Sequence, residues 1–327
     1  MKRCAVLAAP IGLLAAVLTL YGCSGGPSVS GNFDRSFTVT GPIRLELSNA
    51  AGDVQNSGSA DGKVNVHASV HSSGMGFDNP QTRLDEFLAN PPVEQKGDTI
   101  RIGKDMSHVR NLAVSYTIEV PHDTEVTTTV VSGSQTIRSV RGPVKAQAAS
   151  GSIRVEHIDR EAQLISIGGS LDATDVGDDV RGSSASGAVS VNNAKGDVRI
   201  NALSGVIHVA KPGGRVDAET ASGSVDVQGA TNDVKARSAS GQIAVQGNPA
   251  SNAYWQLKTA SGAVKLSVPS TANFQLSADA TSGDIRADVP IVIEEQGKHS
   301  LRAHVGNGGA RVEVHTVSGN IRISGSN

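Results

Sequence analysis

The chain repeats a glycine at intervals of 18 residues through its central part. A serine precedes this glycine at every position but one, where Gly168 stands instead. A fixed short period is the signature of a solenoid, in which each repeat forms one coil and contacts only its neighbours. The repeat therefore constrains the architecture more than any other feature of the sequence. The repeated glycines are Gly133, Gly151, Gly169, Gly187, Gly205, Gly223 and Gly241.

Each period divides into two halves of nine residues, and apolar residues alternate with polar ones in both halves. This pattern predicts two short strands and two turns per coil. Stacked coils lie about 4.8 Å apart, so branched side chains pack against their equivalents one coil away. We therefore expect an all-β, parallel β-solenoid. The predicted inward pairs are Ile153/Val155, Leu171/Ala173, Val189/Val191, Ile207/Val209, Val225/Val227 and Ile243/Val245, with Val144/Ala146, Val198/Ile200, Val216/Ala218 and Val234/Ala236 in the other half.

The glycine interval lengthens beyond the central part. It is 21 residues from Gly241 to Gly262, 21 again to Gly283, and then 36, or two periods, to Gly319. We expect the repeat to continue to the C-terminus with insertions at its turns.

The first residues have the form of a bacterial lipoprotein signal. Two basic residues precede an apolar run at 5–20, and the sequence Leu20-Tyr-Gly-Cys23 has the form of a lipobox, in which the cysteine accepts lipid. These features predict a signal peptide at 1–22 that is removed from the mature chain. The alternative is an uncleaved membrane anchor, for which the apolar run is short.

Cleavage of the signal peptide would determine which cysteines the mature chain retains. Cys4 leaves with the signal peptide, so Cys23 is the one cysteine of the mature chain and no internal disulfide is expected. Residues 23–32, rich in Ser and Gly, read as a flexible tether. We expect a lipid-anchored protein of the cell envelope, on the outer membrane or facing the periplasm if the host is Gram-negative.

The folded part is predicted to be one β-solenoid domain at 33–327. Its repeats occupy 123–327, and a less regular β segment at 33–122 precedes them. Within that segment we expect a helix at about 80–89 and a strand at 113–120. An atypical first segment can cover the unpaired strand edge at the end of a solenoid.

The repeats resemble a bacterial β-strand-repeat family of unknown function that is regarded as adhesin-like and is also called toastrack. The resemblance covers about 33–327 and implies a parallel β-solenoid and an envelope location. It carries no established catalytic residues. The motifs are Val131-Ser-Gly-Ser, Ala149-Ser-Gly-Ser-Ile-Arg-Val155, Ala260-Ser-Gly-Ala-Val-Lys-Leu-Ser-Val-Pro269, Thr281-Ser-Gly-Asp-Ile285 and Val317-Ser-Gly-Asn-Ile-Arg-Ile323, preceded by the strand Tyr116-Thr-Ile-Glu-Val-Pro121.

Motifs that carry chemistry are scarce. No phosphate-binding Gly-x-x-x-x-Gly-Lys loop occurs, and the stretch Thr174–Asp179 lacks the arrangement of a calcium-binding roll. His67 and His71 share a strand face without a third ligand, which is more typical of surface residues than of a zinc site. We therefore predict no cofactor and no metal. A net charge of −2 gives no reason to expect nucleic acid as a partner.

Two outward columns of one wall carry most of the charge of the repeats. Stacked carboxylates about 5 Å apart there could resemble the pair of a retaining glycosidase. However, Asp197 and Arg199 form an oppositely charged pair, and in the next coil Arg215 and Asp217 form such a pair with the two signs exchanged. Each of these pairs stays neutral, which favours a solvated, charge-balanced wall. The columns are Glu161, Asp179, Asp197, Arg215 and Asp233, and Gln163, Arg181, Arg199, Asp217 and Lys235.

The opposite wall is predicted to be flatter and less charged. A weakly charged patch on a secreted protein often marks a contact surface, although another segment of the chain could equally cover it. We take Ser170, Ala188, Val206 and Ser224 as the candidate partner surface. The two columns of this wall are Ser152, Ser170, Ala188, Val206, Ser224 and Gln242, and Arg154, Asp172, Ser190, His208, Asp226 and Ala244.

Two classes of function fit these features. The first is a non-enzymatic envelope lipoprotein whose solenoid presents a binding or scaffolding surface to an envelope protein or glycan. The alternative is a carbohydrate-active β-helix enzyme, or an envelope-stress-associated protein. A sugar-cleaving enzyme should have aromatic platforms, but the chain has one tryptophan, Trp255. The sequence favours the non-enzymatic lipoprotein.

Overall fold

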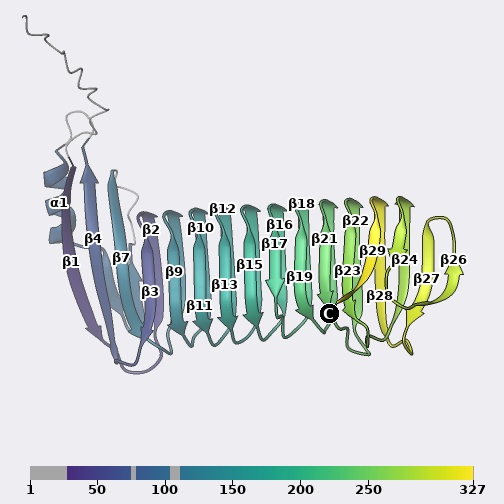
Figure 1. The fold of residues 1–327 in the computed structure, drawn as a ribbon. Helices are drawn as coiled ribbons and strands as arrows, with labels where there is room; N and C mark the ends of the chain where they lie inside the picture. The colour runs from purple at the N-terminus through teal and green to yellow at the C-terminus, as the bar shows by residue number, and fades with distance from the viewer. Residues whose placement is uncertain (1–27, 75–78, 104–110, 327) are drawn as a thin grey trace, which may run out of the picture.

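The computed structural model, which describes residues 28–74, 79–103 and 111–326, contains two long β-sheets that face each other. The chain passes alternately from one sheet to the other, so each coil contributes one strand to each sheet (Figure 1). The strands of the repeats pair in parallel. The predicted all-β parallel solenoid is confirmed.

We call the two sheets sheet A and sheet B. The spatial order in sheet A is β1 (Ser28–Thr38), β4 (Lys63–Ser73), β7 (Leu112–Pro121), β3 (Val54–Ser59), β9 (Gln135–Val140), β11 (Ile153–Ile158), β13 (Leu171–Val176), β15 (Val189–Ala194), β17 (Ile207–Ala210), β19 (Val225–Ala230), β21 (Ile243–Gly247), β23 (Val264–Pro269), β29 (Ile321–Ser326) and β25 (Ile285–Ala287). The order in sheet B is β26 (Val292–Gln296), β27 (Ser300–Val305), β24 (Phe274–Ser282), β28 (Ala310–Ser318), β22 (Tyr254–Ser261), β20 (Val234–Ser240), β18 (Val216–Ser222), β16 (Val198–Ser204), β14 (Val180–Ser186), β12 (Ala162–Gly168), β10 (Val144–Ser150), β8 (Glu125–Ser132), β2 (Arg44–Ala51), β6 (Thr99–Ile102) and β5 (Val93–Lys96).

Neighbouring coils are in register at an offset of 18 residues. Val189 pairs with Ile207 in sheet A, and Val198 pairs with Val216 in sheet B. Every predicted inward residue is at most 2% exposed, so the predicted strand register is confirmed. The core is a thin double layer of Val, Ile, Leu and Ala that runs the length of the solenoid.

The repeated glycine occupies a corner that other residues cannot occupy. Gly205 has a φ of 137°, and a Cβ at this position would lie 2.2 Å from the carbonyl oxygen of Gly187 in the preceding coil. Both the backbone conformation and the close stacking of coils therefore require glycine here.

The opposite turn of the coil also has a left-handed residue, but it is usually not glycine. Lys211 has a φ of 51°, although left-handed backbone costs an L-residue about 1–2 kcal/mol. Asn193, at the equivalent place, donates from Nδ2 to Oδ1 of Asp175 in the preceding coil at 2.6 Å. The sequence alone did not reveal this column, which consists of Ser139, His157, Asp175, Asn193, Lys211 and Gly229.

The last coils are not stacked in chain order. β28 lies between β22 and β24, and β29 lies between β23 and β25 (Figure 1). Gly319 therefore stacks on Gly262, and Gly283 stacks on Gly319. The expectation that the repeat continues is confirmed, with the final coil inserted between two earlier ones. On its other side β24 pairs antiparallel with β27.

The N-terminal end is closed by longer strands. β1 and β4 pair antiparallel, β4 pairs antiparallel with β7, and β7 continues sheet A in parallel to β3. The expected helix is α1 (Pro80–Ala89), which packs against β1 and β4. The Asn79 side chain accepts a hydrogen bond from Gln81 N at its start, and Leu84 and Phe87 are buried.

Candidate functional site

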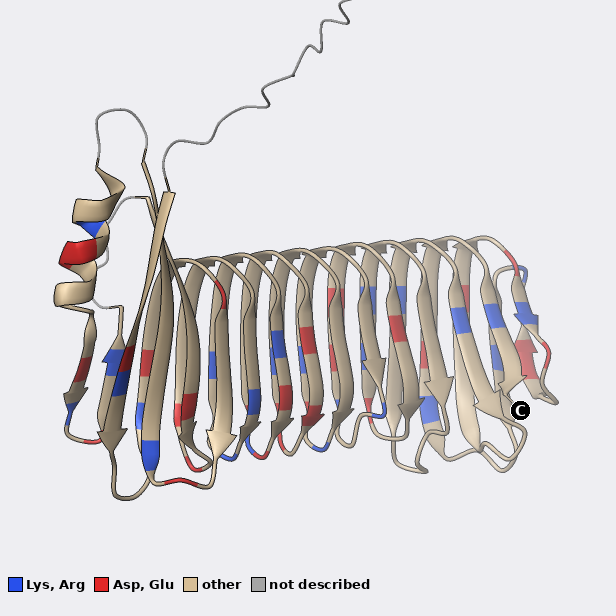
Figure 2. Cartoon of the chain, turned by 60° about the vertical axis from the view of Figure 1, so that its left-hand side comes forward, with Lys and Arg blue, Asp and Glu red and all other residues tan. Residues whose placement is uncertain are grey.

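One long edge of the solenoid is formed by the serine-glycine turns that lead from sheet B to sheet A. Nine successive turns of the stack carry no charged residue, and Figure 2 shows this edge uncoloured along the repeats. The turns at its two ends carry a charged residue: Asp53 follows Gly52, and Asp284 follows Gly283. We call this feature the Ser-Gly edge. It consists of residues 131–134, 149–152, 167–170, 185–188, 203–206, 221–224, 239–242, 260–263 and 317–320, in the order in which the turns are stacked.

The four residues of the candidate partner surface are the last residues of four of these turns. Ala188 and Val206 are exposed, whereas Ser170 and Ser224 are half-buried. The Ser170 hydroxyl lies 3.1 Å from the hydroxyl of Ser152 in the preceding coil. The structure thus brings the four residues together in one row along the Ser-Gly edge.

The first residues of the same turns form a second row that sequence analysis missed. Val131, Ile167, Leu203 and Val317 are 56, 63, 64 and 47% exposed, and alanines occupy the first position of the other five turns. These large apolar side chains point into solvent at positions where a solvated turn would carry polar residues. Their position two residues before the repeated glycine was the signal in the sequence.

The neighbouring column of sheet A is more polar than predicted. Arg154 lies 3.9 Å from Asp172, and Nδ1 of His208 lies 2.9 Å from Oδ2 of Asp226. The uncharged surface is therefore the narrow Ser-Gly edge and not the whole wall.

Buried hydroxyl groups hold the Ser-Gly edge from inside. Ser238 donates to the carbonyl oxygen of Gly223 at 3.0 Å, Thr259 to that of Gly241, and Thr316 to that of Gly262. A buried hydrogen bond of this kind contributes about 1 kcal/mol and fixes the path of the turn. These bonds hold the turns whose first residues are Ala221, Ala239 and Ala260.

The carboxylates of the charged wall have structural partners. Oδ1 of Asp179 accepts from the backbone N–H of Asp197, and Oδ1 of Asp197 accepts from that of Arg215. Asp179 also forms an ion pair with Arg181 at 3.3 Å, and Arg215 pairs with Asp233 at 3.3 Å. This column caps the start of each following strand, which is a role in folding.

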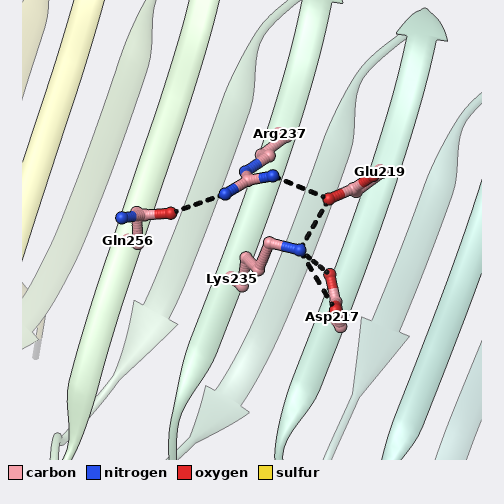
Figure 3. Close-up of polar contacts among 5 residues, drawn as sticks. All are labelled: Asp217, Glu219, Lys235, Arg237 and Gln256. Carbon is pink, nitrogen blue, oxygen red and sulfur yellow. Dashed lines mark hydrogen bonds and ion pairs between the residues drawn. The ribbon is translucent and has the colours of Figure 1, made fainter.

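The densest polar cluster lies on sheet B and joins four charged side chains and one amide (Figure 3). Nζ of Lys235 lies 2.7 Å from Glu219 and 3.2 Å from Asp217, and Arg237 bridges Glu219 to Gln256. The hydrogen bond from Lys235 lowers the pKa of Glu219. A retaining glycosidase needs a general acid whose pKa is raised, and the lowered pKa of Glu219 does not fit that role.

Other groups that could carry chemistry are engaged elsewhere. Trp255 is fully buried and donates to the carbonyl oxygen of Asn232 at 2.7 Å, so it cannot serve as a sugar platform. His67 and His71 face β1, where they contact Asp34 and Ser30. Within residues 28–74, 79–103 and 111–326, no three His, Cys, Asp or Glu side chains converge on a point that could hold a metal.

The family model that matches this sequence is described as Toastrack DUF4097, and it covers residues 93–324. The chain belongs to this toastrack family. The match includes every turn of the Ser-Gly edge. A search of curated proteins found no matching relative.

Two solved structures are similar to this toastrack chain. A proposed adhesin from Bacteroides fragilis is 12% identical, with a TM-score of 0.32, over 90% of this chain and 97% of that chain. A proposed cell adhesion protein from Clostridium sporogenes is 11% identical, with a TM-score of 0.20, over 91% of this chain and all of that chain. Scores of this size do not establish a common fold, so the assignment depends on the family model.

Two parts of the toastrack chain concern the predicted membrane anchor. Cys23, the predicted lipid acceptor, lies outside the described residues. α1, the helix in the described part of the chain, is too short and too polar to cross a bilayer.

Proposed function

We propose that this toastrack protein is a non-enzymatic, lipid-anchored component of the cell envelope that uses the Ser-Gly edge as an adhesin-like binding surface. The observation that carries the proposal is the row of exposed apolar side chains on nine uncharged turns. An uncharged surface is inexpensive to desolvate, and apolar side chains gain free energy when a partner covers them.

Anchoring is the second element of the proposal. Lipid on Cys23 would hold the N-terminal end at a membrane. The predicted tether at 23–32 is too long, because β1 begins at Ser28 and pairs with β4, so the link from the lipid to the solenoid would be the residues before Ser28. The partner class that fits is an envelope protein or glycan with an uncharged contact surface.

A paired set of variants tests the proposed surface. In Ala188→Glu/Val206→Glu two charges stand on the Ser-Gly edge, and both positions are exposed, so the fold is retained. Asp179→Asn/Asp197→Asn alters the charged wall and keeps the Oδ1 acceptors that cap the strands. We expect envelope material that co-purifies with the wild-type chain to be lost with the first variant and retained with the second.

The same variants address the enzyme alternative. We expect the purified protein to release no reducing ends from envelope polysaccharides. A glycan-cleaving activity that disappears in Asp179→Asn/Asp197→Asn would refute the proposal and establish the enzyme instead.

A further inference from the structure

The outer face of sheet B has a groove beside the Ser-Gly edge. The groove has a volume of about 540 Å³ and crosses β18, β20, β22 and β28, which are four consecutive strands of the sheet. A recess of this size can hold a small organic ligand. Its two sides differ in chemistry, so each side indicates a different part of that ligand.

One side of the groove is apolar. Ala221, Ala239 and Ala260 form this side, and Val317 of the next coil lies at one end of it. Because coils are about 4.8 Å apart, the three alanines make a flat strip about 10 Å long. Leu203, in the coil on the other side of Ala221, is 64% exposed. We call this feature the alanine strip.

The other side of the groove is a row of polar side chains at equivalent positions of successive coils. Arg237 pairs with Lys258 in the register of sheet B, and Lys258 pairs with His315. Glu219 precedes Arg237 in the same row. Two cationic side chains and an imidazole thus follow one another at intervals of about 4.8 Å, and neighbouring cations attract an anion together.

Lys258 is the member of this row that lacks a partner. Two lysines in the described part of the chain, Lys235 and Lys258, are half-buried. Lys235 contacts two carboxylates, whereas Lys258 has no hydrogen bond or ion pair within residues 28–74, 79–103 and 111–326. Removing a charge from water without a counter-charge costs free energy. Lys258 therefore indicates a place for an anion.

The carboxylates around Lys258 have other partners or lie further along the row. Glu219 contacts Lys235 at 2.7 Å and Arg237 at 3.2 Å (Figure 3). Glu313 accepts a hydrogen bond from the hydroxyl group of Tyr254. Asp279 follows His315 in the row, which places it two coils from Lys258. The counter-charge of Lys258 is thus not supplied by the described part of the chain.

From these observations we infer that the groove binds an acidic oligosaccharide. A carboxylate of the sugar contacts Lys258 and His315, and the C–H faces of the rings pack on the alanine strip. A pyranose ring is about as long as one coil spacing of about 4.8 Å, so successive rings of an extended sugar chain each face one coil. An extended peptide advances about 3.3 Å per residue and does not keep this register. The inference goes beyond the proposed function, because this ligand is charged and lies on the face of sheet B.

Isothermal titration calorimetry with trigalacturonate tests the role of the charge. The full chain, in detergent if it carries lipid, should bind trigalacturonate, and the neutral methyl ester of this trisaccharide should bind at least fivefold more weakly. Lys258→Gln should weaken the binding of trigalacturonate at least fivefold. Lys265→Gln is the matched control and should leave the affinity unchanged, because Lys265 is exposed on the next strand of the chain, β23, in sheet A.

A second pair of variants tests the alanine strip. Ala239→Leu fills the groove and should reduce the affinity for trigalacturonate at least fivefold. Ala185→Leu is the control, because Ala185 has the same position relative to its corner glycine and lies outside the groove. The natural Leu203 occupies this position in its own turn, so we expect both variants to fold.

The possible outcomes separate this inference from the proposed function. No binding of trigalacturonate, equal affinity for its methyl ester, or equal losses with Lys258→Gln and Lys265→Gln would overturn the acidic-sugar site. A triglutamate peptide that binds as tightly as trigalacturonate would show that the groove does not select a sugar and would overturn it as well. The proposed function would still stand in these cases if Ala188→Glu/Val206→Glu abolishes binding of envelope material.

Discussion

The substitution Ile207→Asp tests the coil most directly. Ile207 is fully buried and pairs with Val189 on one side and Val225 on the other. Losing the burial of an isoleucine side chain costs about 2–3 kcal/mol, and burying a polar group without a partner adds about 2 kcal/mol or more. The total of about 4–5 kcal/mol approaches the whole stability of an ordinary domain.

Val206→Asp provides the control, because it introduces the same charge in place of a β-branched residue one position earlier. Val206 is 47% exposed and points outward from the turn, so we expect a cost of about 1 kcal/mol or less. Urea unfolding can be followed through the fluorescence of Trp255, the single, buried tryptophan, and through the circular dichroism of the strands. Equal shifts of the unfolding midpoint for the two variants would refute the inward assignment of Ile207.

Three further predictions concern the turns, the charged cluster and the anchor. Lys211→Gly should raise the free energy of unfolding by about 1 kcal/mol, because it removes left-handed strain. Gly205→Ala should lower the free energy of unfolding, because a Cβ there meets the preceding coil. A stabilising effect of Gly205→Ala would contradict the stacking argument. Because Lys235 lowers the pKa of Glu219, the stabilisation from this pair is present above the ordinary Glu pKa of 4.5 and is lost as the pH falls through the lowered value. Glu219→Gln should therefore lose less stability than wild type on acidification. Thermal unfolding at several pH values would measure the difference. Cys23→Ser should release the protein from membranes or leave it unprocessed, and an unmodified Cys23 in mature, membrane-bound protein, seen by mass spectrometry, would rule out lipid anchoring.

The coil could be predicted because two periodicities agree in this sequence. The 18-residue period of Ser-Gly positions fixes the stacking, and the two-residue alternation around residues such as Ile207 fixes which side chains point inward. The order of the last coils could not be predicted in this way. Any coil can stack on any other when both offer the same apolar residues, as Ile285 and Ile321 do against their neighbours.

The candidate site could be predicted only in part. The row that contains Ala188 and Val206 was found, because it lies next to strand positions whose direction is fixed by alternation. The row of Val131, Ile167 and Leu203 lies where the strand bends into the turn. The alternation of apolar and polar residues along the strand no longer indicates there which way a side chain points. The left-handed column was missed because its six positions, from Ser139 to Gly229, carry six different residue types, so no repeated residue marks it in the sequence.

The position of the final coil has a consequence for how the protein is made. β28 and β29 are synthesised after β22–β25, yet they fill a place between two coils that leave the ribosome earlier. Until the last residues emerge, β22 and β23 keep an unpaired edge, and β24 has no parallel neighbour. A chain that ends prematurely, before residue 310, thus retains an open edge that can pair with other chains and aggregate. Completion of the solenoid therefore depends on complete translation of the chain.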